Sequence, residues 1–209
     1  MKTSFFTFGT FLLLLTGMVS CKDKASTDTI AQSREVVPTV CVYTLGDVSK
    51  KLQYAMMDSL QARYPKCKMA GNIPLPVKAR TTQRNDHVRY RADILNNVLS
   101  GYKTDSTLVI GITQADIGLD NFRGRAHSGI MGLASGIGTG VAVFSSYRPR
   151  GNAQLFSVML HEIGHAQGLR HCTDTQCLMQ NAKGGNPFSK TNVFCNKCKS
   201  YMKSKQWKL

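Results

Sequence analysis

Acidic residues are scarce in this 209-residue sequence, which contains 12 Asp and Glu residues against 27 Lys and Arg residues. The resulting net charge of +15 invites comparison with proteins that bind nucleic acids. The basic residues, however, are scattered along the chain and form no nucleic-acid-binding motif. We therefore expect no nucleic acid among the partners of this protein.

Near its start, the sequence also lacks an apolar run of the length that a membrane span requires. Residues 5–15 are apolar apart from two Thr and one Gly, and charged residues follow at positions 22–24. A short apolar run behind a basic residue is typical of a cleaved signal peptide. We therefore assign residues 1–20 to a signal peptide.

The end of this segment reads Met18-Val19-Ser20-Cys21 and resembles a bacterial lipobox, in which a small residue precedes a Cys that is lipidated and becomes the new N-terminus. The alternative is an ordinary signal peptide that leaves Cys21 as a free thiol. Lys22 follows the cysteine, where enteric bacteria use an aspartate to retain lipoproteins at the inner membrane. We therefore expect an exported lipoprotein of the cell envelope, anchored in the outer membrane through lipid on Cys21.

The rest of the chain divides into a linker and one domain. The residues between Cys21 and Pro38 are polar, rich in Ser, Thr and Asp, and without apolar periodicity, which is typical of a tether. Hydrophobic residues make up 42% of the chain, enough for the packed core of a single domain. We therefore expect an anchor and linker at 21–38 and a folded, monomeric domain at 39–209.

Hydrophobic patterning predicts alternating strands and helices in this domain. Apolar and β-branched runs predict strands at 39–45, 67–73, 107–113 and 141–146, with a short edge strand at 128–133. Apolar residues on one helical face predict helices at 50–64, at 86–99 and from 151 or 152 to about 167. This order predicts an α/β layered domain with a mostly parallel sheet.

The last predicted helix contains the sequence H-E-I-G-H at residues 161–165. Residues i and i+4 lie on one helical face, so both imidazoles can bind one metal ion. Gly168 can end the helix and turn the chain back, which would bring His171 to the same metal. Three neutral ligands leave a fourth position for water, the arrangement of a catalytic zinc site. Glu162 lies close enough to accept a proton from that water.

The composition makes this spacing informative. The chain has only five His and two Glu, yet three of the His and one of the Glu fall within eleven residues. A bare H-E-x-x-H can occur by accident on a surface helix, but the added Gly and third His make an accident rare. His87 and His127 have no such context, and we interpret both as ordinary surface residues.

The segment H-E-I-G-H-A-Q-G-L-R-H, residues 161–171, is the extended zinc motif of the metzincin clan. Cys172 follows directly, then Cys177 and Met179, and later the C-N-K-C sequence at 195–198. This pattern resembles the archaemetzincins, whose motif runs from the third His into Cys, four residues, Cys, one residue, Met, and later Cys-x-x-Cys. The resemblance extends from about residue 39 to the C-terminus.

The resemblance implies an α/β (α+β) fold with a metzincin-like, twisted and mostly parallel sheet, an active-site helix and a small zinc-clamped C-terminal subdomain. It implies that Met179 is the Met-turn residue, an apolar floor beneath the zinc, although a simple core Met would occupy the same place. It also implies that a structural zinc is held by four cysteines: Cys172, Cys177, Cys195 and Cys198.

The cysteines leave alternatives open. The envelope is oxidising, so the four C-terminal cysteines can also form two disulfides. The C-x-x-C pair at 195–198, with a second pair at Cys172 and Cys177, favours zinc by its spacing. Cys41 and Cys67 lie on strands expected to be neighbours, where they can form a disulfide or remain buried thiols.

We interpret the sequence as a zinc-dependent metallopeptidase with two zinc ions per chain. His161, His165 and His171 would hold the catalytic zinc. Glu162 would activate the zinc-bound water that hydrolyses a peptide bond of a peptide or protein substrate. By the resemblance, the edge strand expected at 128–133 would pair with the substrate backbone, the alternative being that this segment is a mobile glycine-rich loop. One alternative is a zinc-holding surface lipoprotein that acts mainly as a binding module; another is hydrolysis of a non-peptide amide.

Overall fold

The structure is a computed structural model, and it describes residues 37–120, 128–183 and 185–209. The expected signal peptide, Cys21, nearly all of the linker and His127 lie outside these residues. Among the described helices, none has both the length and the apolar character that crossing a membrane requires.

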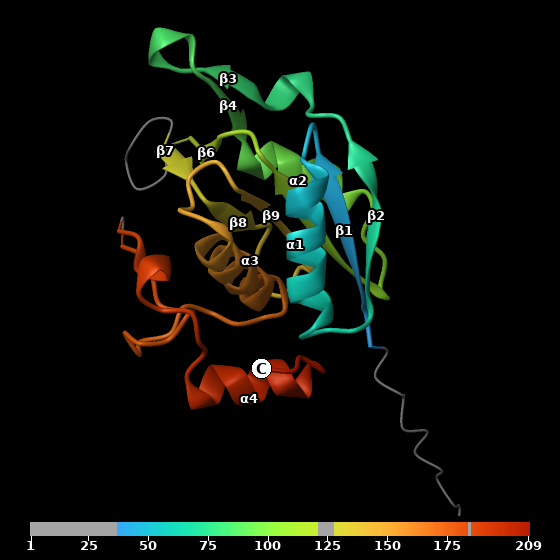
Figure 1. Cartoon of the computed structure of the whole chain (residues 1–209), viewed down its shortest axis with the longest axis vertical. Helices are drawn as coiled ribbons and strands as arrows, with labels where there is room; N and C mark the ends of the chain where they lie inside the picture. The colour runs from blue at the N-terminus through green and yellow to red at the C-terminus, as the bar shows by residue number, and fades with distance from the viewer. Residues whose placement is uncertain (1–36, 121–127, 184) are drawn as a thin grey trace, which may run out of the picture. The chain divides into compact units, whose positions relative to one another are not determined.

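Five strands form the central sheet: β1 (Thr39–Leu45), β2 (Cys67–Ile73), β5 (Thr107–Thr113), β8 (Gly132–Ala134) and β9 (Val141–Ser145). Their order across the sheet is β2-β1-β5-β9-β8 (Figure 1). The first four pair in parallel, and β8 pairs antiparallel with β9 at the edge. The predicted α/β fold with a mostly parallel sheet is confirmed.

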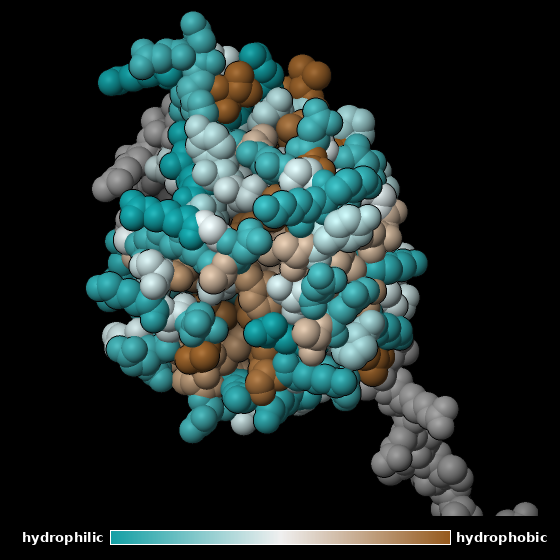
Figure 2. Space-filling view, in the orientation of Figure 1, coloured by the Kyte–Doolittle hydropathy of each residue, from teal (hydrophilic) through white to brown (hydrophobic). Residues whose placement is uncertain are grey.

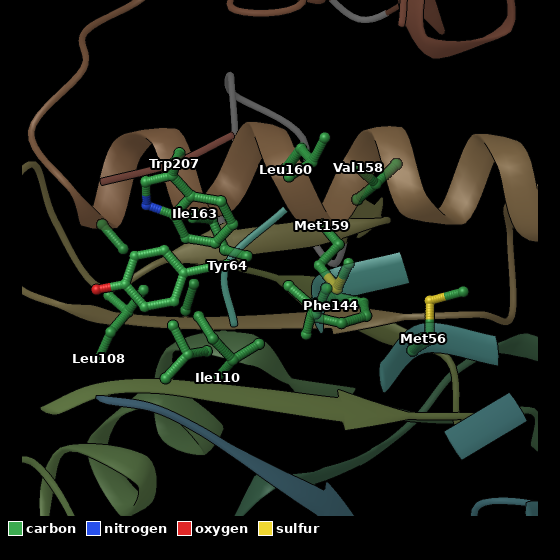
Figure 3. Packing of buried hydrophobic residues seen from close by; sticks show 14 of the residues in the cluster. Met56, Tyr64, Leu108, Ile110, Phe144, Val158, Met159, Leu160, Ile163 and Trp207 are labelled. Carbon is green, nitrogen blue, oxygen red and sulfur yellow. The ribbon is translucent and has the colours of Figure 1, made fainter. Parts of the chain in front are cut away.

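Helices cover both faces of this sheet: α1 (Lys50–Gln61), α2 (Ala92–Ser100) and α3 (Asn152–Ala166). Residues alternate between the two faces of a strand, and β5 shows the result. Ile110 and Ile112 belong to the core that contains α1 and α3, whereas Val109 belongs to the core that contains α2. Figure 3 shows Met159 of α3 next to Phe144 of β9 in the first of these cores.

A second sheet contains four short strands: β3 (Arg80–Thr82), β4 (Val88–Arg91), β6 (Ile117–Leu119) and β7 (Ser128–Ile130). Their order is β3-β4-β6-β7. The helix predicted at 86–99 is therefore wrong in its first half, because β4 pairs with β3 and β6. The single edge strand predicted at 128–133 is wrong too: the chain changes sheets at Met131, so that β7 pairs with β6 and β8 with β9.

The C-terminal segment contains a helix that is missing from the predicted elements, α4 (Asn196–Ser204). After it, the Trp207 ring packs on the ring of Tyr64 with centroids 4.7 Å apart (Figure 3). The backbone N–H of Lys208 donates to the carbonyl of Arg63 at 2.8 Å. These contacts hold the chain end against the end of α1. Three short 3-10 helices complete the described elements: Val77–Ala79, Arg84–Asp86 and Pro187–Ser189.

Cys41 and Cys67 lie on neighbouring strands but do not face each other. The β1–β2 register places Cys67 beside Val40, and Cys41 beside Lys68. Adjacent residues of a strand point to opposite faces, so the two thiols lie on opposite sides of the sheet. Both are buried and free, and burial raises the pKa of the Cys67 thiol. The alternative of a disulfide between them is therefore wrong.

The surface in the view of Figure 2 carries hydrophilic side chains spread among apolar ones.

Candidate metal and catalytic centre

Helix α3 carries the first part of the site, and a glycine ends it. His161 and His165 lie one turn apart near the C-terminal end of α3. Gly168 follows with a φ of +116°, a conformation that favours glycine, and the Tyr201 hydroxyl lies where a side chain would be. The chain then turns back and brings His171 to the two helical histidines, as predicted from the position of Gly168.

The three imidazoles converge through their Nε2 atoms. Nε2 of His165 lies 3.1 Å from Nε2 of His161 and 3.3 Å from Nε2 of His171. Ligand nitrogens about 2.0–2.1 Å from a tetrahedral zinc are separated by about 3.3 Å, so the observed spacing fits a zinc ion.

Backbone carbonyls fix the tautomers of the two helical histidines. Nδ1 of His161 lies 2.8 Å from the carbonyl oxygen of Leu178, and Nδ1 of His165 lies 2.7 Å from that of Leu169. A carbonyl can only accept, so each Nδ1 carries the proton and each Nε2 presents a bare lone pair. Two bare lone pairs 3.1 Å apart repel each other, and a shared cation removes this repulsion.

Burial keeps these imidazoles in the neutral form that metals bind. Burial, assisted by the neighbouring His165, lowers the pKa of His161 to about 3. Burial also lowers the pKa of His165. His171, in contrast, is exposed, and its Nδ1 lies 3.5 Å from the side-chain amide of Asn181.

Glu162 lies beside this centre and is 8% exposed. The backbone N–H of Ala134 in β8 donates to its Oε2 at 2.8 Å. Burial raises the pKa of the Glu162 carboxyl to about 8, and the Ala134 hydrogen bond opposes that shift. Gly132 of the same strand packs so closely against Glu162 that a Cβ atom on Gly132 would lie 2.6 Å from Cγ of Glu162. The edge strand therefore both holds the carboxylate and requires a glycine to make room for it.

Met179 lies beneath the histidine helix and is fully buried. Its Sδ lies so near Gly164 that a Cβ atom on that glycine would be 2.6 Å away. The Met179 carbonyl accepts from the N–H of Cys172 at 2.8 Å, which ties its turn to the residue after His171. This placement fits a Met-turn residue and a simple core Met alike.

The four C-terminal cysteines form a second cluster, in which every Sγ lies within 4.8 Å of the others. Sγ of Cys172 and Sγ of Cys195 are 3.8 Å apart. That separation matches the edge of a tetrahedron with Zn–S bonds of about 2.3 Å, roughly 3.8 Å. A disulfide would require about 2.05 Å. Sγ of Cys177 also accepts the N–H groups of Met179 and Cys195, at 3.4 and 3.3 Å, as a thiolate ligand does.

A cleft of about 640 Å³ opens above the three histidines and Glu162. One wall is formed by the chain from Gly129 to Ala134, which includes β8. The segment after His171, including Asn181 and Phe188, also lines the cleft. The site thus combines a three-histidine centre, a buried carboxylate and room for an extended ligand.

The model of peptidase family M54 matches residues 69–204 of this chain. The chain belongs to peptidase family M54, the archaemetzincins. The archaemetzincin of Aeropyrum pernix is 29% identical over 151 residues, which cover 65% of this chain and 76% of that relative. The archaemetzincin of Haloarcula marismortui is 30% identical over 159 residues, which cover 67% and 84%. The crystal structure of the Methanopyrus kandleri archaemetzincin has the same fold, with a TM-score of 0.64 at 22% identity, over 83% of this chain and 97% of that one.

Family membership makes the protein a zinc metallopeptidase, a hydrolase. The predicted resemblance to archaemetzincins is thereby confirmed. The two side-chain clusters, one of three His and one of four Cys, suggest two zinc sites in this archaemetzincin-family peptidase.

A further cluster of charged side chains is centred on the buried Asp116. No motif in the sequence indicates it. Its carboxylate accepts from Arg89 at 2.7 Å and from Arg148 at 2.8 and 2.9 Å. Nε2 of His87 lies 2.9 Å from the same carboxylate, and the His87 side chain is 35% exposed. The interpretation of His87 as an ordinary surface residue is therefore wrong. The one local signal was an acid placed just before the apolar strand β6.

Proposed function

We propose that this peptidase hydrolyses peptide bonds with Glu162 as the general base and His161, His165 and His171 as ligands of the catalytic zinc. The observation that supports this proposal most strongly is the convergence of three Nε2 atoms, at 3.1 and 3.3 Å, beside a buried carboxylate in an open cleft. A zinc ion held by the three imidazoles supplies a Lewis acid that polarises the scissile carbonyl and acidifies water.

The two carboxylate oxygens of Glu162 have different roles in the proposed mechanism. The N–H of Ala134 holds Oε2 in place, which leaves Oε1 to take the proton of the attacking water. Glu162 then passes that proton to the nitrogen of the leaving amine. Burial raises the pKa of the Glu162 carboxyl and so makes its carboxylate a stronger base, while the charge of a bound zinc ion beside it would oppose this shift and keep the group ionised.

We propose that Cys172, Cys177, Cys195 and Cys198 bind a structural zinc as thiolates. The Sγ spacing and the N–H groups directed at the sulfur of Cys177 support this ligand set. Cys172 is the neighbour of His171, so a rigid thiolate cluster would also fix the third catalytic ligand.

We further propose that the substrate backbone pairs with β8. β8 is the edge strand of the sheet, and Leu133 pairs with Val143 of β9. Backbone groups alternate in direction along a strand, so those of Gly132 and Ala134 point away from β9. Since the Ala134 N–H donates to Glu162, the Gly132 N–H and carbonyl and the Ala134 carbonyl are the groups proposed to pair with the peptide. An extended peptide added antiparallel at this edge would pass over Glu162.

The decisive test is digestion of a peptide library by the wild type and by Glu162→Ala, both loaded with zinc and read by mass spectrometry. We expect Glu162→Ala to retain both zinc ions and to lose hydrolysis, because Glu162 is a base and not a ligand. Unchanged cleavage by Glu162→Ala would contradict the mechanism. Absence of cleavage by the wild type, with peptides still bound, would favour the alternative of a binding module.

We propose that the mature protein is an exported lipoprotein anchored through Cys21, with a linker up to residue 38 and the peptidase domain at 39–209. The lipobox-like sequence before Cys21 supports the anchor. The position of Lys22 supports the outer membrane as its location.

A further inference from the structure

Arg148 lies in the wall of the active-site cleft and is held there by a buried partner. It follows β9 by three residues and lines the cleft together with Gly129 and Ile130. The guanidinium lies flat on Gly129, where any larger residue would collide with it. Its side chain is 33% exposed, whereas that of its partner Asp116 is fully buried.

The hydrogen bonds to Asp116 use only one edge of this guanidinium. Nε donates to Oδ1 at 2.8 Å and Nη2 donates to Oδ2 at 2.9 Å. A guanidinium has five N–H groups, so three remain, on Nη1 and on the other side of Nη2. The Nη1–Nη2 edge has the fork geometry that binds a carboxylate in a bidentate manner. Fixing one edge on a buried acid orients the other edge in advance.

Positive charge exceeds negative charge around this edge. Asp116 is shared with a second guanidinium, that of Arg89, so one carboxylate faces two permanent cations. Arg170 is a further cation in the cleft lining. Among the described residues of that lining, Glu162 is the only acid. The cleft therefore favours an anionic ligand group over a cationic one.

The chain direction places this charge on one side of the scissile bond. Gly129 precedes Gly132, the residue that packs against Glu162. A peptide that pairs antiparallel with β8 runs in the opposite direction along the cleft. Its residues beyond the scissile bond, toward its C-terminus, therefore lie beside Ile130 and Gly129, where Arg148 lies.

We infer that Arg148 is a specificity-determining residue that binds a substrate carboxylate on the C-terminal side of the scissile bond. This inference rests on the proposed function, because it uses the β8 edge and the position of Glu162. The carboxylate is either an acidic side chain or the free C-terminus of a short peptide. Both present the same chemistry to the guanidinium.

Binding to the zinc-loaded Glu162→Ala protein tests this inference without requiring hydrolysis. The probes are a set of fluorescent peptides, each with Asp, Asn or Lys at one of the three positions after the central bond. Each peptide is made in two forms, one ending in a free carboxylate and one ending in an amide. We expect carboxylate-bearing peptides to bind with a Kd about 10- to 100-fold lower than the matched Asn amide, the range of one charge-assisted bidentate contact. A lower Kd that depends on Asp at one position indicates an acidic side chain, whereas a lower Kd that depends on the free carboxylate at the peptide end indicates the C-terminus.

Paired variants assign the preference to Arg148. In the same background, Arg148→Met should bring the ratio of the two Kd values to about one, and Arg148→Lys should leave an intermediate ratio because it keeps charge but loses the fork. Arg89→Gln is the matched control, since it also removes a guanidinium from Asp116 but does not line the cleft. Using a ratio within each variant cancels any general loss of folded protein, and Arg148→Lys keeps a cation for Asp116 if Arg148→Met does not fold.

Equal binding of acidic and neutral peptides to the Glu162→Ala protein would overturn the inference, as would a preference that survives Arg148→Met. Hydrolysis by the zinc-loaded wild type is measured separately on the same peptides. Cleavage without an acidic preference in binding would leave the proposed function standing and remove only the role of Arg148. An acidic preference in binding without cleavage would support the role of Arg148 and contradict the peptidase mechanism.

Discussion

The contact between Gly132 and Glu162 allows the proposed base to be displaced without changing it. In Gly132→Ala, the new methyl carbon would lie 2.6 Å from Cγ and 3.1 Å from Oε1 of Glu162. Nonbonded carbons sit about 3.5–4.0 Å apart, so the Glu162 side chain must move by about 1 Å. The carboxylate would also strain its hydrogen bond to Ala134, two residues further along the same strand.

The kinetic consequence follows from the displacement. A misplacement of about 1 Å at a catalytic group costs on the order of 100-fold in rate. That factor corresponds to about 2.7 kcal/mol of transition-state stabilisation. The three atoms nearest to the added methyl all belong to Glu162 and none to a histidine, so zinc binding should persist.

The assay measures kcat and KM on one peptide, with zinc content and Tm determined on the same preparation. Gly101→Ala is the control for the substitution itself, because Gly101 has a φ of −66° at the end of α2 and lies outside the cleft lining. We expect kcat to fall in Gly132→Ala and to stay unchanged in Gly101→Ala. A Gly132→Ala protein with full zinc and wild-type kcat would refute the assignment of Glu162 as a positioned base.

Three further predictions concern the metals and the anchor. His165→Ala should lose one of two zinc ions by plasma mass spectrometry, because its Nε2 lies next to both other ligand atoms; retention of both ions would contradict the ligand set. In the domain without Cys21, chelation should release four thiols that react with a thiol reagent, whereas two disulfides would release none. Labelled palmitate should mark the wild type but not Cys21→Ala, and an unlabelled wild type would leave only a conventional signal peptide.

The parts of the fold that the sequence predicts well are those fixed by local pattern. The strands at Thr39–Leu45 and Thr107–Thr113 have the predicted bounds, because continuous apolar runs between turns favour buried strands. The strand at Cys67–Ile73 also has the predicted bounds, although several of its residues are exposed. The three histidines also come together as predicted, since two share a helix face and Gly168 dictates the turn to the third.

The parts that it predicts poorly depend on pairing between distant segments. Val88–Arg91 fits a helical stripe as well as a strand, and its pairing with β6 decides the outcome. The break at Met131 likewise follows from the use of two different sheets by β7 and β8. Asp116 and Arg148 are 32 positions apart, so no local motif can join them.

The adjacency of His171 and Cys172 joins the two ligand clusters through a single peptide bond. When metal binding fixes the backbone at Cys172, part of the loss of conformational entropy required to fix His171 has already occurred. If both clusters bind zinc as proposed, occupancy of either one would strengthen binding at the other, and by thermodynamic reciprocity the two coupling free energies would be equal. The protein would then bind its two ions cooperatively.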